Sequence, residues 1–157
     1  MKKSCVFLLS ETLMRLLLGC LLAHVAMAEL IPWSWWVPDL TLVGLVVAAG
    51  QRPERWLMFS VLAGLATMVW AVRFPGLVFA GYLALGWAVQ ASAKQWDATD
   101  PRIQNLLVGI ASTLLTFGTL WLHDRWSFLL VGLASARVVM TCGALPLVRR
   151  VLRSRSA

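Results

Sequence analysis

Three charged residues interrupt otherwise apolar stretches of this sequence and are the first candidates for chemistry. Glu11 and Arg15 lie four residues apart, in the acid-first order that pairs favourably on one face of a helix. Arg137 lies within a second apolar stretch near the other end of the chain. A charge near the middle of a bilayer costs at least ~2.5–3.5 kcal/mol, so such residues face the bundle interior, water or a partner. We expect Glu11 to bridge Arg15 and Arg137, either as an internal clip or with one positive charge left for a partner's acid or a buried anion.

An aspartate and a pair of small residues are the next candidates. Asp39 lies between Pro38 and Leu40 at the start of an apolar stretch. There it would cap a helix N-terminus in the outer membrane interface, or contact a partner. Gly19 and Ala23 form a small-xxx-small pair, which lets a second helix approach closely. The candidate partner contacts are therefore Pro38, Asp39, Leu40, Gly19 and Ala23. For Gly19 and Ala23, packing within the bundle is the alternative role.

Patterns typical of catalysis or metal binding are missing from the sequence. His123 and Asp124 are adjacent and resemble a general-base pair, but no serine or cysteine nucleophile is placed beside them. The chain has no HExxH, no GxSxG, no P-loop and no cluster of carboxylates with metal-ligand spacing. Its three cysteines form no CxxC and are expected to be reduced packing residues. We predict a protein that is not an enzyme and holds no cofactor or metal.

The elements that must position these residues are long apolar blocks separated by short polar turns. Of the 157 residues, 60% are hydrophobic and 13% are charged, about half the charged share of a soluble domain. Blocks of roughly 17–20 residues can cross a ~30 Å hydrocarbon layer at ~1.5 Å per residue. The pattern excludes a soluble enzyme and predicts an all-α membrane protein with one domain, residues 1–157, folded as a six-helix bundle. The predicted spans are approximately 6–28, 36–49, 56–72, 77–93, 103–122 and 127–148.

Basic residues are distributed unequally between the predicted loops. With six spans, one side of the membrane receives ten Lys and Arg residues, and the other receives only Arg73 and Arg125. The ten are Lys2, Lys3, Arg52, Arg55, Lys94, Arg102, Arg149, Arg150, Arg153 and Arg155. Because short loops rich in Lys and Arg stay in the cytoplasm, both termini are predicted to be cytoplasmic. The net charge of +7 then reflects orientation and membrane lipids, not nucleic acid. The last four arginines form a basic tail, expected to bind the inner leaflet.

A succession of short motifs between about residues 32 and 115 resembles MreD, the rod-shape-determining inner-membrane protein family of bacteria. The motifs are Pro38-Asp39-Leu40 with Thr41-Leu42-Val43, Arg52-Pro53, Gly64-Leu65, Pro75-Gly76, Gly81-Tyr82-Leu83-Ala84, and Pro101 with Gln104. The sequence departs from the family after Gly64-Leu65, where an acidic residue is common and residues 66–70 have none.

The resemblance implies a non-enzymatic scaffold in the bacterial inner membrane. MreD-like proteins associate with MreC, a protein with one membrane span, and together they link MreB filaments to the peptidoglycan synthesis enzymes of the elongasome. In this reading the basic tail anchors the chain to lipid or contacts MreB.

A second class of protein has the same predicted architecture. MreD-like bundles resemble the substrate-binding S components of energy-coupling-factor transporters, which also have six helices and both ends inside. Trp87, Tyr82 and Arg137 would then line an outward pocket for a small ligand. A buried outward cavity would favour this alternative, whereas a packed core would favour a scaffold.

Overall fold

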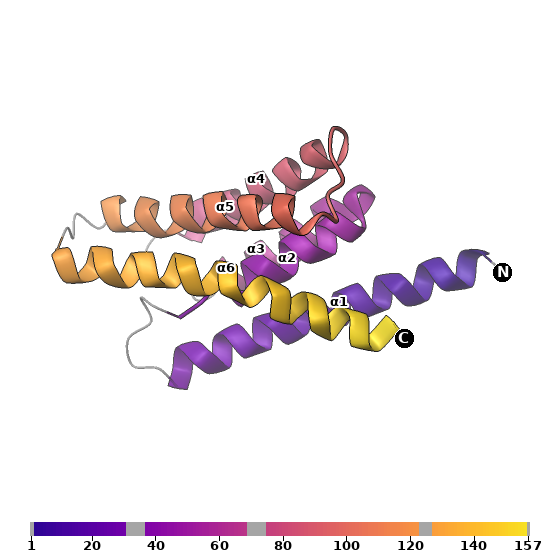
Figure 1. Ribbon diagram of the computed structural model, residues 1–157, viewed down its shortest axis with the longest axis horizontal. Coiled ribbons are helices and arrows are strands. Elements are labelled where there is room, and N and C mark those ends of the chain that lie inside the picture. The colour runs from indigo at the N-terminus through magenta and orange to yellow at the C-terminus, as the bar shows by residue number, and fades with distance from the viewer. Residues whose placement is uncertain (1, 31–36, 69–74, 123–126, 157) are drawn as a thin grey trace.

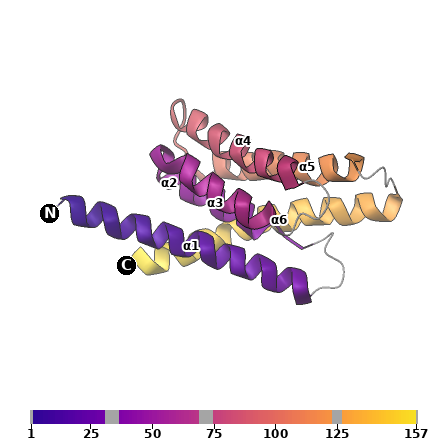
Figure 2. The same ribbon diagram turned by 180° about the vertical axis from the view of Figure 1, so that it is seen from behind.

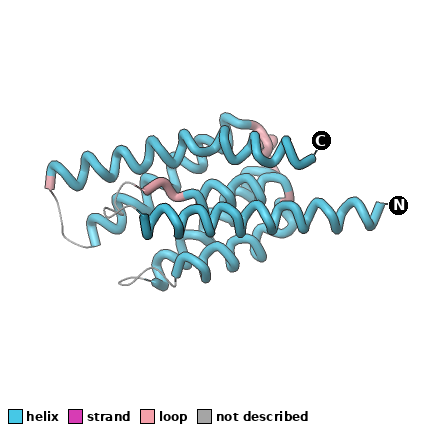
Figure 3. Tube along the Cα trace, turned by 90° about the horizontal axis from the view of Figure 1, so that it is seen from below, coloured by secondary structure: helices cyan, strands magenta, loops and turns pink. Residues whose placement is uncertain are grey.

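The computed structural model describes residues 2–30, 37–68, 75–122 and 127–156, with side chains described from Glu11 to Val151 within these ranges. The regular structure in these ranges is entirely helical, which confirms the predicted all-α class. The elements are α1 (Lys2–Leu30), α2 (Leu40–Gln51), the single-turn η2 (Pro53–Arg55), α3 (Trp56–Met68), α4 (Pro75–Ala93), α5 (Pro101–Leu122) and α6 (Phe128–Ser156). The helices run back and forth along the long axis of the molecule (Figure 1). Both termini lie at the same end of the bundle (Figure 3).

Among the described residues, four helical segments are long and apolar enough to cross a membrane. They are Glu11–Leu30, Pro75–Ala93, Pro101–Leu122 and Phe128–Val151. These segments confirm the prediction of a membrane protein. The apolar helix α2 has only 12 residues, or about 18 Å at the helical rise. It is therefore shorter than the hydrocarbon layer that it was predicted to cross.

Helix α2 forms the centre of the bundle. Every residue from Thr41 to Gly50 is buried, and α2 contacts α1, α3, α4, α5 and α6. A helix that is surrounded on all sides can be apolar all round, as this one is. Helix α1 lies on the outside of the bundle, and its N-terminal part extends past the other helices (Figure 2). The central position of α2 explains why a short helix can begin inside the protein, whereas its last residue, Gln51, is exposed.

The end of the bundle that holds both termini also holds the polar turns. Arg52 and Glu54 form an ion pair of 3.2 Å in the turn after α2. In the turn before α5, the Asp97 carboxylate accepts hydrogen bonds from the hydroxyl and the backbone N–H of Thr99. These bonds lower the pKa of the exposed Asp97, because they favour its charged form.

The predicted basic tail belongs to α6, which continues to Ser156 beyond the predicted end of the sixth span at residue 148. Arg149 donates a hydrogen bond of 2.6 Å to the carbonyl oxygen of Thr99, so it joins α6 to the turn before α5. Arg150 is exposed. The side chains of Arg153 and Arg155 lie outside the described residues, as do the predicted loop residues Arg73, His123, Asp124 and Arg125.

Candidate functional site

The candidate site is built around the buried N-terminus of α2. The first turn of a helix leaves backbone N–H groups without intrahelical partners, and inside a membrane protein no bulk water can satisfy them. Asp39 meets part of this need, because its Oδ1 accepts the Leu42 N–H at 3.0 Å. The predicted capping role of Asp39 is confirmed. Asp39 is only 8% exposed, so it lies inside the bundle, and its place in the membrane interface stays a prediction.

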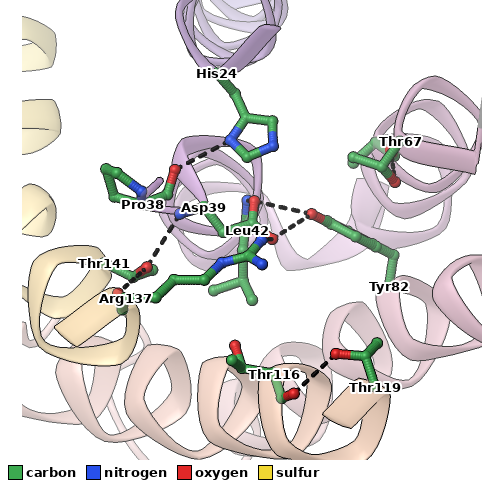
Figure 4. Close-up of polar contacts among 11 residues, drawn as sticks. His24, Pro38, Asp39, Leu42, Thr67, Tyr82, Thr116, Thr119, Arg137 and Thr141 are labelled. Atoms are coloured by element: carbon green, nitrogen blue, oxygen red, sulfur yellow. Dashed lines mark hydrogen bonds and ion pairs between the residues drawn. The ribbon is translucent and has the colours of Figure 1, made fainter. Parts of the chain in front are cut away.

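Helices α4 and α6 supply the other partners of Asp39 (Figure 4). The Tyr82 hydroxyl of α4 lies 3.0 Å from both carboxylate oxygens and donates to them. Thr141 of α6 accepts the Asp39 backbone N–H at 3.0 Å and donates its own hydrogen to the Arg137 carbonyl at 2.8 Å. The Arg137 guanidinium lies 3.9 Å from Asp39 Oδ2, which is an ion pair but too long for a hydrogen bond. The network joins three helices at one buried carboxylate.

Helix α1 reaches the same region through His24. The Nδ1 of His24 lies 3.0 Å from the Pro38 carbonyl oxygen. Since a carbonyl oxygen can only accept, Nδ1 carries the hydrogen of this bond. His24 therefore fixes the residue that precedes the cap.

A cavity of about 250 Å³ opens beside this network. Six of its polar lining residues come one each from the six α-helices or their caps: His24, Asp39, Thr67, Tyr82, Ser112 and Arg137. Thr116 and Thr119 of α5 complete the polar part of the wall. In Figure 4 the Arg137 side chain reaches from α6 toward the centre, with Asp39 on one side and Thr116 on the other. We call this space the polar cavity.

Two hydrogen-bonding groups at the polar cavity have no partner among the described residues. The Ser112 hydroxyl is buried, with 2% of the residue exposed, and makes no hydrogen bond. The Nε of Arg137 is also buried and unpaired. Buried polar groups in proteins are nearly always satisfied, so each such group requires an explanation.

A second feature is an apolar groove of about 380 Å³ between α1 and α6. Gly19, Ala23 and Arg15 of α1 line one side of it. The other side is formed by Ala144, Leu147, Val148 and Val151 of α6. Gly19 and Ala23 are exposed, and a methyl group added at Gly19 would meet nothing within 4 Å. We call this feature the α1–α6 groove.

The predicted charge cluster is divided between these two features. Arg15 and Glu11 form the expected pair, with Nη2 and Oε1 2.6 Å apart. The predicted bridge from Glu11 to Arg137 is wrong, because Arg137 pairs with Asp39 instead. Arg15 lines the same groove as Val148 and Val151, which lie 11 to 14 residues beyond Arg137, or roughly 16–21 Å along α6. Each arginine has its own carboxylate, so this cluster leaves no positive charge over.

The candidate partner contacts also separate. Gly19 and Ala23 are exposed, as a partner contact requires. The Asp39 side chain instead accepts hydrogen bonds from inside the bundle, so it is a structural cap and not the predicted partner contact. Pro38 and Leu40 are half-buried beside it. Of the three residues predicted for an outward pocket, Tyr82 and Arg137 line the polar cavity. Trp87 does not line it, because its side chain is on the outer surface of α4 with 60% exposed.

Sequence reasoning did not single out the hydroxyl residues of α5. The buried residues of this helix are Gln104, Val108, Ser112, Thr116 and Leu120. They recur at every fourth position, which places them on one face. Three polar residues on the inward face of an apolar helix are the signal that could have predicted a polar wall there.

Comparison of the chain with known proteins finds no matching family model, no matching curated protein and no matching solved structure.

Proposed function

We propose that this protein is a non-enzymatic scaffold of the bacterial inner membrane that binds a single-span partner helix in the α1–α6 groove. The observation that carries the proposal is the Glu11–Arg15 pair, whose side chains are 45% and 67% exposed on a helix that otherwise qualifies as a membrane span. A charge pair left facing hydrocarbon is unfavourable, and a partner that covers it with polar groups lowers that cost.

The surroundings of the pair suit a helix. Gly19 and Ala23 lie one and two turns beyond Arg15 and line the same groove. Small residues let two backbones approach closely, which is how helices associate in membranes without a hydrophobic driving force. The groove therefore offers close packing along its length and a polar contact at one end.

The MreD resemblance gives this partner an identity. In that reading the partner is an MreC-like protein with one span, and the complex links MreB and the peptidoglycan synthesis enzymes of the elongasome that sets cell shape. Two of the motifs that carry the resemblance are in contact in the fold. Asp39 of Pro38-Asp39-Leu40 accepts a hydrogen bond from Tyr82 of Gly81-Tyr82-Leu83-Ala84. The excess of basic residues in the turns beside the termini supports an even number of crossings with both ends cytoplasmic.

The alternative function is a substrate-binding subunit of a transporter, similar to an S component. The polar cavity, with Tyr82 and Arg137 in its wall, favours it. The volume of about 250 Å³ is below the ~300–1,000 Å³ typical of pockets for drug-sized ligands. A vitamin-sized substrate is therefore disfavoured.

Substituting leucine for Ala23 is expected to abolish recovery of the partner while leaving the fold intact. The longer side chain would occupy the α1–α6 groove, and Ala23 is exposed and so tolerates it. The measurement is purification of the tagged protein from native membranes in mild detergent, followed by mass spectrometry.

The matched control is Gly132→Leu in α6, an exposed position where an added methyl group meets nothing within 4 Å. Wild type and the control should recover a single-span protein and wall-elongation enzymes, and Ala23→Leu should lose both. Recovery of ATPases and a transmembrane coupling subunit instead would support transport. Equal recovery of the single-span protein by Ala23→Leu would show that it docks elsewhere.

A further inference from the structure

We propose that the polar cavity is a binding site for an oxyanion, of which a phosphate group is the simplest example. This site is lined by different residues from the α1–α6 groove and does not depend on the scaffold function. Arg137 of α6 is the charged donor, and Ser112 of α5 is a hydroxyl donor that lines the same cavity.

An inventory of hydrogen-bonding groups sets the chemistry of the ligand. The Asp39 carboxylate is nearly satisfied, because it accepts the Leu42 N–H and the Tyr82 hydroxyl. The Nε of Arg137 is buried without a partner among the described residues, and its Nη2 lies 3.9 Å from Asp39 Oδ2, beyond hydrogen-bond distance. The cavity therefore has donors in excess, and a ligand that fits must bring acceptors.

The Ser112 hydroxyl is a second group that a ligand with hydrogen-bond acceptors would satisfy. It is buried, lines the cavity and has no partner in the described part of the chain. A hydroxyl can donate one hydrogen bond and accept two. An oxyanion between Ser112 and Arg137 would satisfy both residues at once, with charge-assisted bonds that are stronger than neutral ones.

The Asp39 carboxylate balances the charge of Arg137, so an anion here would be held by hydrogen-bond donors and not by a surplus positive charge. Asp39 is paired with Arg137, and it caps the N-terminus of α2, where the helix dipole contributes a partial positive charge. Asp39 and Thr116 lie on opposite sides of the Arg137 side chain (Figure 4). The anion would bind on the α5 side of the guanidinium, away from Asp39. The volume of about 250 Å³ suits one small group, which is either a free phosphate or the phosphate of a lipid headgroup.

Ser112→Ala is the variant that tests the site. Removing a buried hydroxyl without a partner is expected to leave the melting temperature of the ligand-free protein unchanged or slightly raised. The same change should weaken phosphate binding about tenfold, since one charge-assisted hydrogen bond is worth about that factor. A hydroxyl that only fills space would not affect binding.

The experiment uses the full chain purified in detergent without phosphate. Thermal unfolding is followed while inorganic phosphate is added, with sodium chloride at matched ionic strength as the reference. Native mass spectrometry then counts bound phosphatidylglycerol. Wild type, Ser112→Ala and Arg137→Gln are compared with Arg15→Gln, which removes an arginine that lies outside the cavity.

A saturable rise in melting temperature with phosphate, weakened in Ser112→Ala and lost in Arg137→Gln, would assign the site to free phosphate. One retained phosphatidylglycerol in wild type and Arg15→Gln, lost in the two cavity variants, would assign it to a lipid headgroup. If Arg137→Gln does not fold, Ser112→Ala decides alone. Wild type and Ser112→Ala that respond equally to both probes, or to neither, would overturn the proposal.

Discussion

Replacing Asp39 with alanine is expected to lower the free energy of unfolding by about 3–5 kcal/mol, the usual cost of breaking a buried ion pair by removing one partner. The variant leaves Arg137 without its carboxylate and the Tyr82 hydroxyl without an acceptor. It also removes the cap from the Leu42 N–H at a helix end that is buried. Each of these groups would then lie unsatisfied inside the bundle, where bulk water cannot replace the lost bonds.

The matched control for this variant is Asp100→Ala. The Asp100 carboxylate accepts the Arg102 N–H at 2.8 Å at the start of α5, but this cap is exposed. Losing an exposed cap costs about 1 kcal/mol. Unfolding in detergent can be followed by circular dichroism and by the reactivity of the Cys20 thiol, which is buried in the folded protein. If Asp39→Ala lost no more stability than Asp100→Ala, the buried network would not stabilise the fold as described.

The helices could be predicted from the sequence because their signals are local. The fourth and fifth predicted spans, 77–93 and 103–122, begin two residues after the observed starts of α4 and α5 and end where those helices end. Both helices begin at proline, Pro75 and Pro101, which favours the first helical position because its missing N–H would be unpaired there anyway. The Glu11–Arg15 pair is also local, since a spacing of four fixes one face of α1.

The partner of Arg137 could not be predicted, because it depends on how deep α2 lies in the bundle. An apolar stretch indicates a span, and its first polar residue then indicates the membrane edge. Asp39 is such a residue, yet it is buried at the start of the short helix α2, inside the bundle. Periodicity gives the face of a helix and not its depth beside a neighbour. The short apolar stretch before Gln51 was the signal that the start of α2 is not at the surface.

Leucine in place of Gly50 is expected to lower the free energy of unfolding by about 3 kcal/mol or more, the upper end for overpacked cores. Gly50 is buried in the last turn of α2. A β-carbon there would lie 2.7 Å from the Ala98 carbonyl oxygen and 2.9 Å from Gln104 Nε2. Neither neighbour can move freely, because Gln104 Nε2 donates to that same carbonyl at 2.8 Å and both residues are buried. The added side chain must displace a backbone segment and break a buried hydrogen bond.

The control for Gly50→Leu is Gly118→Leu in α5, where an added β-carbon meets nothing within 4 Å. Leucine is a better helix former than glycine by close to 1 kcal/mol, so this variant should be as stable as wild type or slightly more stable. Thermal unfolding of the two variants in the same detergent measures the difference. Equal stability of Gly50→Leu and wild type would mean that the turn before α5 can move away from α2 at little cost. The hydrogen bond from Arg149 to Thr99 argues against that outcome, because it holds the same turn to α6 from the other side.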